Sequence, residues 1–329
     1  MHRVRCHECG AYRMERLPFL PSGRARHTRA LARTVIELRA EMSISALANY
    51  FELHWTTVKE IEKDHLKMKY KHISVKDVQV IGIDEIHIGD MKFFTIVRDL
   101  ESGAILHIGK GKGAESLEPF SRRLRRSRCE IEAVTVDFSS AYSSWIKDTL
   151  PDALIVYDHF HLIKLMNDKL NKIRQRTMAE LEEEQKKSLK NKRWLLLKNI
   201  EKLNDDDTCE LNRLRDVYKD LGDASMLKES LRNIYSLAPD IYTATKAFKK
   251  WCNLAIETGI KELKTMAKTI TSHLDGILAN WYLNISNASM EGFNNKIRCL
   301  VRQAYGYHDE EYFRLKIFDL PNLKTIKLL

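Results

Sequence analysis

Long apolar segments are missing from this sequence. No run reaches the length needed to cross a membrane, and the chain is polar from His2 onward, which excludes an apolar signal segment at the N-terminus. Closely spaced cysteines are also scarce, because among the six in the chain only Cys6 and Cys9 lie near each other. A disulfide framework is therefore excluded, and we expect a cytoplasmic protein with reduced thiols.

Glycine and proline are scarce between residues 161 and 275, and no internal repeat is evident there. The pattern of this block is charged and helical. Disorder is excluded for most of the chain, since apolar residues make up 44% of it. We therefore predict an all-helical segment over residues 161–275.

The charge balance limits the classes of partner. Lysine and arginine together number 55 against 45 acids, which gives a net charge of +10. Such an excess favours a polyanionic partner, most often a nucleic acid. A basic protein without such a partner is the alternative.

Residues 1–21 contain Cys6-His-Glu-Cys9-Gly, the C-x-x-C-G pattern that closes one half of a zinc ribbon. Zinc requires four ligands, and no second cysteine pair lies in this region. Either His7, His27 or another group completes a site, or the stretch is a partial ribbon that starts halfway. We favour the partial ribbon, and so do not expect Cys6 and Cys9 to hold Zn²⁺.

Residues 24–69 predict a small helical domain. Helical periodicity covers residues 29–40 and 44–51, and a further helix follows over 55–66 after a tight connection. A short helix, a turn and a second helix form the helix-turn-helix arrangement, which predicts DNA binding. An ordinary three-helix scaffold is the alternative. Side chains expected on the outer face of the last helix, and hence at DNA, are Thr56, Thr57, Lys59 and Lys63.

From Val78 the pattern is typical of strands. The predicted strands cover residues 78–84, 93–99, 104–109, 133–137 and 153–158. The first three are joined as hairpins, and helices separate the others. This order predicts a mixed α/β sheet with the ribonuclease-H-like order of elements. We place the first part of this domain at 78–160 and its last part at 276–329.

Two acids end strand-like runs: Asp84 follows Val-Ile-Gly-Ile, and Asp137 follows Ala-Val-Thr-Val. Acids at strand ends in an α/β sheet point into the crevice where ligands bind. A third acid, Glu291, lies on a helix expected over residues 286–305. Three such carboxylates suit two Mg²⁺ or Mn²⁺ ions acting on a phosphodiester. Any one of them alone is more simply a turn or cap residue.

The helix around Glu291 separates into two faces. Phe293, Ile297, Leu300 and Ala304 form the apolar face. On the opposite face the acid is followed by an amide and two guanidinium groups, which suit a phosphate backbone. We therefore predict DNA contacts for Asn295, Arg298 and Arg302.

Other polar residues near the acids are secondary candidates. Asp158 and His161 follow the last strand, where a helix N-cap with an ordinary histidine is an equal alternative. Glu85 points to the face of the strand opposite Asp84 and is a weaker candidate. Tyr142 is a further possible DNA contact, as are Lys164 and Arg298.

Four runs of this sequence resemble the DDE transposases of the bacterial ISL3 insertion-sequence family. They are Ile81-Gly-Ile-Asp84-Glu85, Val134-Thr-Val-Asp137-Phe-Ser-Ser-Ala-Tyr142, Asp158-His-Phe-His-Leu-Ile-Lys164, and Asn287-Ala-Ser-Met-Glu291-Gly-Phe-Asn-Asn-Lys-Ile297 with Arg302-Gln-Ala-Tyr-Gly-Tyr307. The resemblance implies a ribonuclease-H-like catalytic domain with a helical insertion before its last acid. By this resemblance Asp84, Asp137 and Glu291 match the catalytic triad. Asp158 and His161 match an auxiliary D-x-x-H motif.

The resemblance also implies a function. Such a protein cleaves DNA at the ends of its insertion sequence with divalent metal ions, and transfers the freed strands to a target. Its partners would be double-stranded DNA, as terminal inverted repeats and as target, and further copies of the same chain, with no role for a membrane. It would act at the bacterial nucleoid. The alternatives are a catalytically silent DNA-binding protein derived from a transposase, and a structure-specific nuclease of the same fold.

Overall fold

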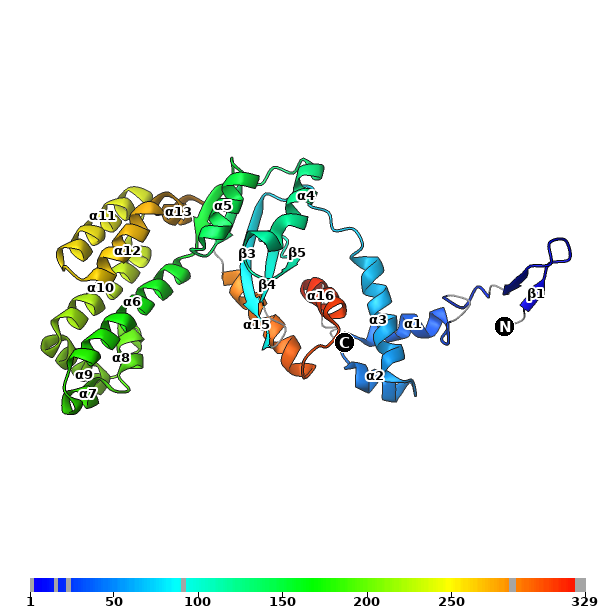
Figure 1. Ribbon diagram of the computed structural model, residues 1–329, viewed down its shortest axis with the longest axis horizontal. Helices are drawn as coiled ribbons and strands as arrows, with labels where there is room; N and C mark the ends of the chain where they lie inside the picture. Colours follow the sequence, from blue (N-terminus) through cyan, green and yellow to red (C-terminus); the bar gives the residue numbers. More distant parts are fainter. Residues whose placement is uncertain (1–2, 15–16, 22–24, 90–92, 284–287, 323–329) are drawn as a thin grey trace. The chain divides into compact units, whose positions relative to one another are not determined.

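A computed structural model describes residues 3–14, 17–21, 25–89, 93–283 and 288–322 (Figure 1). The chain divides into two compact units. We call the first the helix-turn-helix unit; it consists of Met1–Ser74, Ala104–Leu106 and Asn294–Leu329. We call the second the sheet unit; it consists of Val75–Gly103 and His107–Phe293.

Three helices follow one another in the helix-turn-helix unit: α1 (Arg29–Leu38), α2 (Ile44–Tyr50) and α3 (Trp55–Lys69). The predicted helix, turn and helix are confirmed. Ser43 caps α2 by accepting a hydrogen bond from the amide of Ala46, and Glu52 turns the chain with a φ of 53°. The three helices share an apolar core of Val35, Leu47, Ala48, Val58 and Ile61.

Two segments far along the chain belong to the same unit. They are α16 (Glu310–Asp319), which packs on α3, and α15 (Ala288–Gln303) from Asn294 onward. A short helical turn, η4 (Leu320–Asn322), follows α16. From the sequence we predict that residues 276–329, which include α15 and α16, belong to the α/β domain. Instead the part from Asn294 onward groups with the three N-terminal helices, because the charged and aromatic side chains of α16 lie against α3.

The N-terminal segment forms an antiparallel hairpin of β1 (Arg3–Arg5) and β2 (Tyr12–Met14). Its connecting loop carries Cys6 and Cys9. The loop closes through hydrogen bonds from the Cys6 amide to the Ala11 carbonyl and from the Gly10 amide to the Cys6 carbonyl. Gly10 adopts a φ of 68°, which a glycine tolerates without strain.

The sheet unit is built on five strands in the order β5-β4-β3-β6-β7. They are β3 (Val80–His87), β4 (Phe93–Asp99), β5 (Ile105–Lys110), β6 (Ala133–Val136) and β7 (Leu154–Tyr157). β3 pairs with β4 in the antiparallel sense, whereas the pairs of β3 with β6 and of β6 with β7 are parallel. The predicted mixed sheet is therefore confirmed.

Several strand boundaries differ from the prediction by one or two residues, and the end of β3 differs most. The strand expected to end at Asp84 continues to His87, because β4 pairs with it up to the contact of His87 with Phe93. The parallel pairing of β3 with β6, however, ends at Gly82. Asp84 therefore lies in the middle of β3 but beyond the paired part of its parallel neighbour.

Two helices connect the strands before the insertion: α4 (Glu118–Ser127), preceded by the short η2 (Ala114–Leu117), and α5 (Ser140–Thr149). The indole nitrogen of Trp145 donates a hydrogen bond of 2.8 Å to the hydroxyl of Ser121, which joins these two helices. Phe120 and Ile146 are buried beneath them. Figure 1 shows both helices beside the sheet.

The segment after β7 is helical throughout. Its helices are α6 (His159–Glu180), α7 (Glu183–Leu189), α8 (Arg193–Leu197), η3 (Ile200–Lys202), α9 (Asp205–Val217), α10 (Lys219–Leu237), α11 (Ile241–Glu257) and α12 (Lys261–Ser272). Buried Phe248 and Trp251 contribute to its core. Lys228 is buried too; its ammonium donates to the carbonyls of Leu196 and Lys198 at 3.0 and 2.8 Å. No helix among the described residues is long and apolar enough to cross a membrane.

The chain returns from this insertion to the sheet through α13 (Leu274–Leu278) and α14 (Asn280–Leu283). Gly276 lies so close to β7 that an added Cβ would be 2.6 Å from the Tyr157 ring and 2.7 Å from the Ile155 carbonyl oxygen. The amide of Asn280 donates to the Tyr157 carbonyl at 2.9 Å. These contacts hold the return of the chain against the sheet edge. The first residues of the helix expected over 286–305 lie outside the described part.

Candidate active site

Three acids stand level with one another across the sheet. Gly82 pairs with Thr135 in the parallel register, so that two positions further on Asp84 is level with Asp137. Val136 pairs with Tyr157, so that one position further on Asp137 is level with Asp158. Because neighbouring strands lie about 4.8 Å apart, the three backbone positions form a compact row, beyond the paired part of β3 with β6 and directly after β6 and β7. We call this row the acid edge.

Asp137 is at the centre of the acid edge, directly after β6. Its Oδ1 is buried without a hydrogen-bond partner. The loop that carries it turns at once, since the Ser139 amide donates to the Asp137 carbonyl at 2.8 Å. The neighbouring Phe138 ring stacks on Tyr157, with centroids 4.7 Å apart. The side chain is thus fixed at the edge while one carboxylate oxygen lacks a donor.

Asp84 and Glu85 point to opposite faces of β3, as their alternation predicts. The Asp84 carboxylate accepts a hydrogen bond of 2.7 Å from the Glu85 amide. On the other face Glu85 accepts a bond of 2.7 Å from the hydroxyl of Tyr142. Tyr142 is completely buried, so the prediction that it reaches DNA is wrong. The sequence alone does not reveal whether a tyrosine on a helix faces the solvent or, as Tyr142 does, packs against a strand.

Asp158 combines the two alternatives that the sequence left open. It caps α6, because its carboxylate accepts a hydrogen bond of 3.2 Å from the Phe160 amide. It also lies within the electrostatic range of His161 and Glu291. Burial raises the pKa of Asp158 above its ordinary value, and the negative charge of Glu291 raises it further. The Phe160 amide, His159 and His161 act in the opposite direction, so two histidines as well as Glu291 act on this carboxylate.

The first turn of α15, which carries Glu291, rests on the middle of the sheet. An added Cβ at Gly82 would lie 3.0 Å from Cγ of Met290, so β3 and α15 approach closely there. The Arg98 guanidinium donates to the Ser289 carbonyl at 2.7 Å and lies 5.0 Å from the centroid of the Phe293 ring. Sequence reasoning missed Arg98 and Met290. Gly82 within a strand was the one signal of a close approach.

The donor types at the acid edge fit a hard divalent cation, since carboxylate oxygens are the preferred ligands of Mg²⁺. The partnerless Asp137 Oδ1 is an oxygen that such a cation would satisfy. Within the described residues, however, no group of three His, Cys, Asp or Glu side chains is close enough to hold a metal ion. The structure thus aligns Asp84 with Asp137 and brings Glu291 near Asp158, without gathering three carboxylates into one coordination sphere.

The polar face of α15 lies at the surface. Phe293 and Ile297 are buried, whereas Glu291, Asn295, Arg298 and Arg302 are all exposed, as the helical pattern predicts. Arg298 donates to the Asn295 amide oxygen at 2.9 Å, and Arg302 contacts the sulfur of Cys299 at 3.1 Å. The expected apolar residue Ala304 falls just beyond the end of the helix at Gln303. The guanidinium groups therefore remain accessible to an anion.

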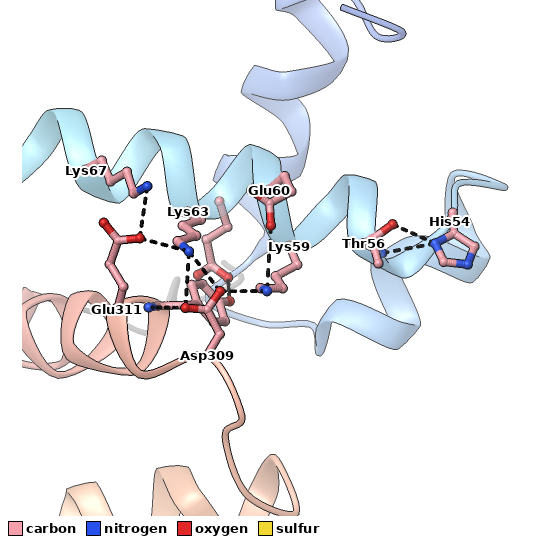
Figure 2. Close-up of polar contacts among 10 residues, drawn as sticks. His54, Thr56, Lys59, Glu60, Lys63, Lys67, Asp309 and Glu311 are labelled. Carbon is pink, nitrogen blue, oxygen red and sulfur yellow. Dashed lines mark hydrogen bonds and ion pairs between the residues drawn. The ribbon is translucent and has the colours of Figure 1, made fainter.

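The four side chains predicted at the DNA face of α3 divide into two pairs. Thr56 is exposed in the first turn, with its hydroxyl 2.7 Å from Nδ1 of the capping His54 (Figure 2). Thr57 is half-buried beside it. The prediction of an outer face is wrong for Lys59 and Lys63, whose side chains are 18% and 12% exposed and face α16.

Figure 2 shows what these lysines contact. The ammonium groups of Lys59 and Lys63 lie 2.7 and 2.8 Å from the Asp309 carboxylate. Lys63 and Lys67 both lie 3.0 Å from the Glu311 carboxylate. Hydrogen bonding to Asp309 raises the pKa of Lys63 to about 12. Helical periodicity identified the lysine side of α3 but could not reveal an acidic helix 250 residues later that covers it.

A buried charge network continues this contact between α3 and α16. Glu62, only 2% exposed, accepts from Arg39 at 3.1 Å and from Lys316 at 2.7 Å, and also accepts the Tyr312 hydroxyl. Asp319 lies 2.6 Å from Arg39 and accepts from Lys69 at 2.7 Å. Burial alone would raise the pKa of Glu62, but Lys316, Tyr312 and Arg39 together hold it below its ordinary value.

Cys6 and Cys9 lie in the loop of the β1–β2 hairpin, and both thiols are free. Hydrogen bonds from the backbone of Cys9 and Glu8 lower the pKa of Cys6. Neither His7 nor His27 joins the cysteines in a group of three metal-binding side chains among the residues that the structure describes.

Comparisons with known proteins agree on a family. Residues 81–317 match the DDE model of ISL3 transposases, and residues 15–66 match the helix-turn-helix domain of transposase family ISL3. Over 322 residues the chain is 32% identical to the transposase for insertion sequence element IS1001 of Bordetella parapertussis, which covers 96% of this chain and 78% of that protein. It is 26% identical over 313 residues to the transposase for element IS1557 of Mycobacterium tuberculosis, covering 87% and 70%.

Among solved structures, the Drosophila P element transposase strand transfer complex matches with a TM-score of 0.48 at 11% identity, covering 94% of this chain and 95% of that one. The family assignment rests on the sequence matches, which extend over the helix-turn-helix and over every residue of the acid edge. The chain therefore belongs to the ISL3 family of DDE transposases, enzymes that cleave DNA and transfer strands at the ends of insertion sequences.

Proposed function

We propose that the acid edge, together with Glu291, is the catalytic centre of this transposase on a ribonuclease-H-like core. The observation that carries the proposal is the strand register: Asp84 within β3 is level with Asp137 and Asp158, which directly follow β6 and β7. The partnerless oxygen of Asp137 supports it, because a buried acceptor without a donor is rare unless it has a function.

Asp84, Asp137 and Glu291 would hold two divalent cations, Mg²⁺ or Mn²⁺, of the kind that DDE transposases use. When bound, such ions activate a water or a 3′-hydroxyl for attack on a phosphodiester and stabilise the leaving oxygen. A direct role in holding the cations is proposed for these three carboxylates alone.

Neighbouring residues would position the triad and the DNA. Arg98 fixes the first turn of α15 through the Ser289 carbonyl, and so orients Glu291. Asp158 holds the start of α6 and with it His161, one turn along, whose ring nitrogen can donate a hydrogen bond to a phosphate or move a proton.

The helix-turn-helix would read the terminal inverted repeats. Residues in the first turn of the second helix of such a motif contact base edges, and here these are the exposed Thr56 and the neighbouring Thr57. Asn295, Arg298 and Arg302 would contact the backbone. We further propose that copies of the chain assemble on DNA, since two ends of one element have to be joined to a target.

The test compares Asp137→Asn with the wild-type chain on duplex DNA carrying the terminal repeats of its own element. We expect cleavage in Mg²⁺ to fall by about 10⁴-fold, the order seen when a single catalytic carboxylate is removed, while DNA affinity stays within about 2-fold. The matched control is Asp148→Asn, an exposed acid on α5 that should cleave normally. Equal losses of cleavage and binding in Asp137→Asn contradict the proposal.

The same assay excludes or supports the two alternatives. A wild-type chain that binds the repeats without cleaving them is a silent DNA-binding protein. A wild-type chain that cuts branched DNA and shows no preference for the repeats is a structure-specific nuclease. Either result contradicts the proposed function.

A further inference from the structure

A cavity of about 580 Å³ opens between α6 and α10 in the sheet unit. We call it the α6–α10 cavity. Its volume lies within the range of small-molecule sites, roughly 300–1,000 Å³. Its lining includes His159, Phe160, Lys164, Asn167, Arg232 and Tyr235. None of them belongs to the proposed catalytic triad.

One wall of the cavity is aromatic. The His159 ring lies 4.0 Å from Phe160 and 5.2 Å from Tyr235, measured between centroids. Tyr235 in turn stacks on Trp281 at 5.1 Å with an interplanar angle of 24°. The stack is anchored, since the Trp281 indole donates to the Ala238 carbonyl at 3.0 Å. Phe160, at its outer end, is 49% exposed, so a flat apolar surface faces the solvent.

Two polar atoms in the cavity wall lack partners. The amide oxygen of Asn167 and the hydroxyl of Tyr235 are buried without a hydrogen bond. A buried polar atom that stays without a partner destabilises the fold, and a ligand that supplies the partner removes that cost. One is an acceptor and the other can donate, so the pair suits a ligand with both kinds of group on one edge.

Positive charge lies at the same cavity. Lys164 is exposed and forms no ion pair among the residues that the structure describes. Arg232 also lines the cavity, with its guanidinium shared between Glu201 and Glu229 at 2.5 Å from each. An anionic group on the ligand would therefore be drawn toward Lys164.

The cavity begins next to the acid edge. His159 follows Asp158 directly, and its Nδ1 lies 3.4 Å from the Asp158 carboxylate. His159, Ile163 and Asn167 recur every four residues, so one face of α6 leads from the acid edge along the cavity. A strand engaged at the acid edge thus has this cavity beside it.

We infer that the α6–α10 cavity binds a nucleotide, with its base against the aromatic wall and its phosphate at Lys164. Stacking requires only a π-face, and the edge of a nucleobase supplies donors and acceptors for Asn167 and Tyr235. The favoured source is an unpaired nucleotide of the DNA strand at the acid edge; a free nucleotide has the same chemistry. The choice of source rests on the proposed function, whereas the cavity itself does not.

The experiment measures dissociation constants of the full-length chain by fluorescence anisotropy. One arm compares terminal-repeat duplexes that are fully paired with duplexes that carry one unpaired adenosine at successive positions around the cleavage site. The other arm adds free AMP as a competitor and follows tryptophan fluorescence. We expect the wild-type chain to bind the best unpaired duplex at least about 10-fold more tightly than the paired one, because the cost of extruding a base is removed.

Two surface variants test the cavity. Phe160→Ala should lose about 5- to 10-fold affinity for the unpaired duplex, in line with the low end of base–aromatic stacking, and retain affinity for the paired one. Lys164→Gln should have a smaller effect in the same direction. The matched control is Tyr242→Ala, an exposed aromatic on α11 that does not line the cavity and should behave as wild type. Circular dichroism confirms that each variant is folded.

The outcomes distinguish a nucleotide of DNA from a free nucleotide, and they distinguish this inference from the catalytic proposal. Saturable binding of AMP that Phe160→Ala weakens, without any preference for unpaired DNA, supports the nucleotide site and assigns it to a free nucleotide. No preference for unpaired DNA together with no AMP binding overturns the inference, as does a preference that Phe160→Ala retains in full. Asp137→Asn should keep the preference, so a failure of the catalytic proposal leaves this result unchanged.

Discussion

Two regions of the molecule are rich in carboxylates: the contact between α3 and α16, and the acid edge. Their carboxylates differ in how they are paired. Between α3 and α16, Glu62 and Asp319 alternate with Arg39, Lys69 and Lys316 at salt-bridge distances. These cations hold the pKa values of Glu62 and Asp319 below their ordinary values, although both carboxylates are buried. At the acid edge the pKa of Asp158 is raised by burial and by Glu291, and an oxygen of Asp137 has no partner.

This difference in pairing distinguishes carboxylates that stabilise the fold from carboxylates that serve catalysis. A carboxylate that the fold surrounds with cations is already satisfied, and removing it costs stability. At the acid edge burial disfavours the charged form of Asp158, and an oxygen of Asp137 lacks a hydrogen-bond donor that a bound cation would replace, so removing one of these carboxylates should cost chemistry. The predictions below test this distinction.

The largest expected effect is on catalysis. Glu291→Gln should reduce Mg²⁺-dependent cleavage by about 10⁴-fold with DNA affinity within about 2-fold, because the amide cannot replace a charged ligand. Cleavage and anisotropy on the same terminal-repeat duplex measure the two quantities. Glu257→Gln, an exposed acid on α11, is the control. A Glu291→Gln chain that cleaves normally would remove Glu291 from the site.

The next effect is on stability. Glu62→Ala should destabilise the helix-turn-helix unit by about 3–5 kcal/mol, since it removes the carboxylate partner of the half-buried Lys316 and leaves Arg39 with Asp319 alone. Hydrogen exchange of the α3 amides, measured in the full chain, reports the loss of stability at this helix. Glu60→Ala, exposed on the same helix, should change stability by less than about 0.5 kcal/mol. Equal effects at Glu62 and Glu60 would show that the network contributes nothing.

The same contact should depend on pH. Because the folded-state pKa values of Glu62 and Asp319 are lowered, their stabilisation is present above the ordinary carboxyl pKa of about 4 and is lost as the pH falls further. Protection of α3 against hydrogen exchange, corrected for intrinsic rates, should therefore fall in acid. Glu62→Gln should make that loss shallower. Unchanged protection down to pH 2 would contradict the pairing.

The smallest effect concerns DNA. Arg298→Gln should lower the slope of log affinity against log salt by about 1, because an accessible guanidinium contacts a phosphate. Lys63→Gln should leave the slope unchanged, since its ammonium is bound to Asp309 and Glu311. Anisotropy between about 50 and 200 mM salt measures both. A reduced slope for Lys63→Gln would mean that DNA displaces the acidic partner.

Local patterns predicted the parts of the fold that depend on neighbouring residues. The ends of β6 and β7 just before Asp137 and Asp158, the helices of the helix-turn-helix and the two faces of α15 all follow from runs of a few residues. The neighbouring positions of Asp137 and Asp158 followed as well, because parallel strands carry their carboxyl ends to one side of a sheet, whereas β3 continues past Asp84.

The contacts that the sequence could not predict join distant segments. The Tyr312 hydroxyl reaches Glu62 across 250 positions, and no periodicity in α3 signals it. The extension of β3 past Asp84 depends on its pairing with β4, and the aromatic wall at Tyr235 depends on α6 and α10 meeting. Each arises from tertiary packing rather than from local preference.

Direct metal binding tests the central claim about the acid edge. Electron paramagnetic resonance of Mn²⁺, titrated into the full-length chain bound to its terminal-repeat DNA, counts bound ions independently of cleavage. We expect two Mn²⁺ ions per chain in the wild type, loss of Mn²⁺ binding in Asp137→Asn, and wild-type binding in Asp148→Asn. Mn²⁺ binding that is unchanged in Asp137→Asn would contradict it.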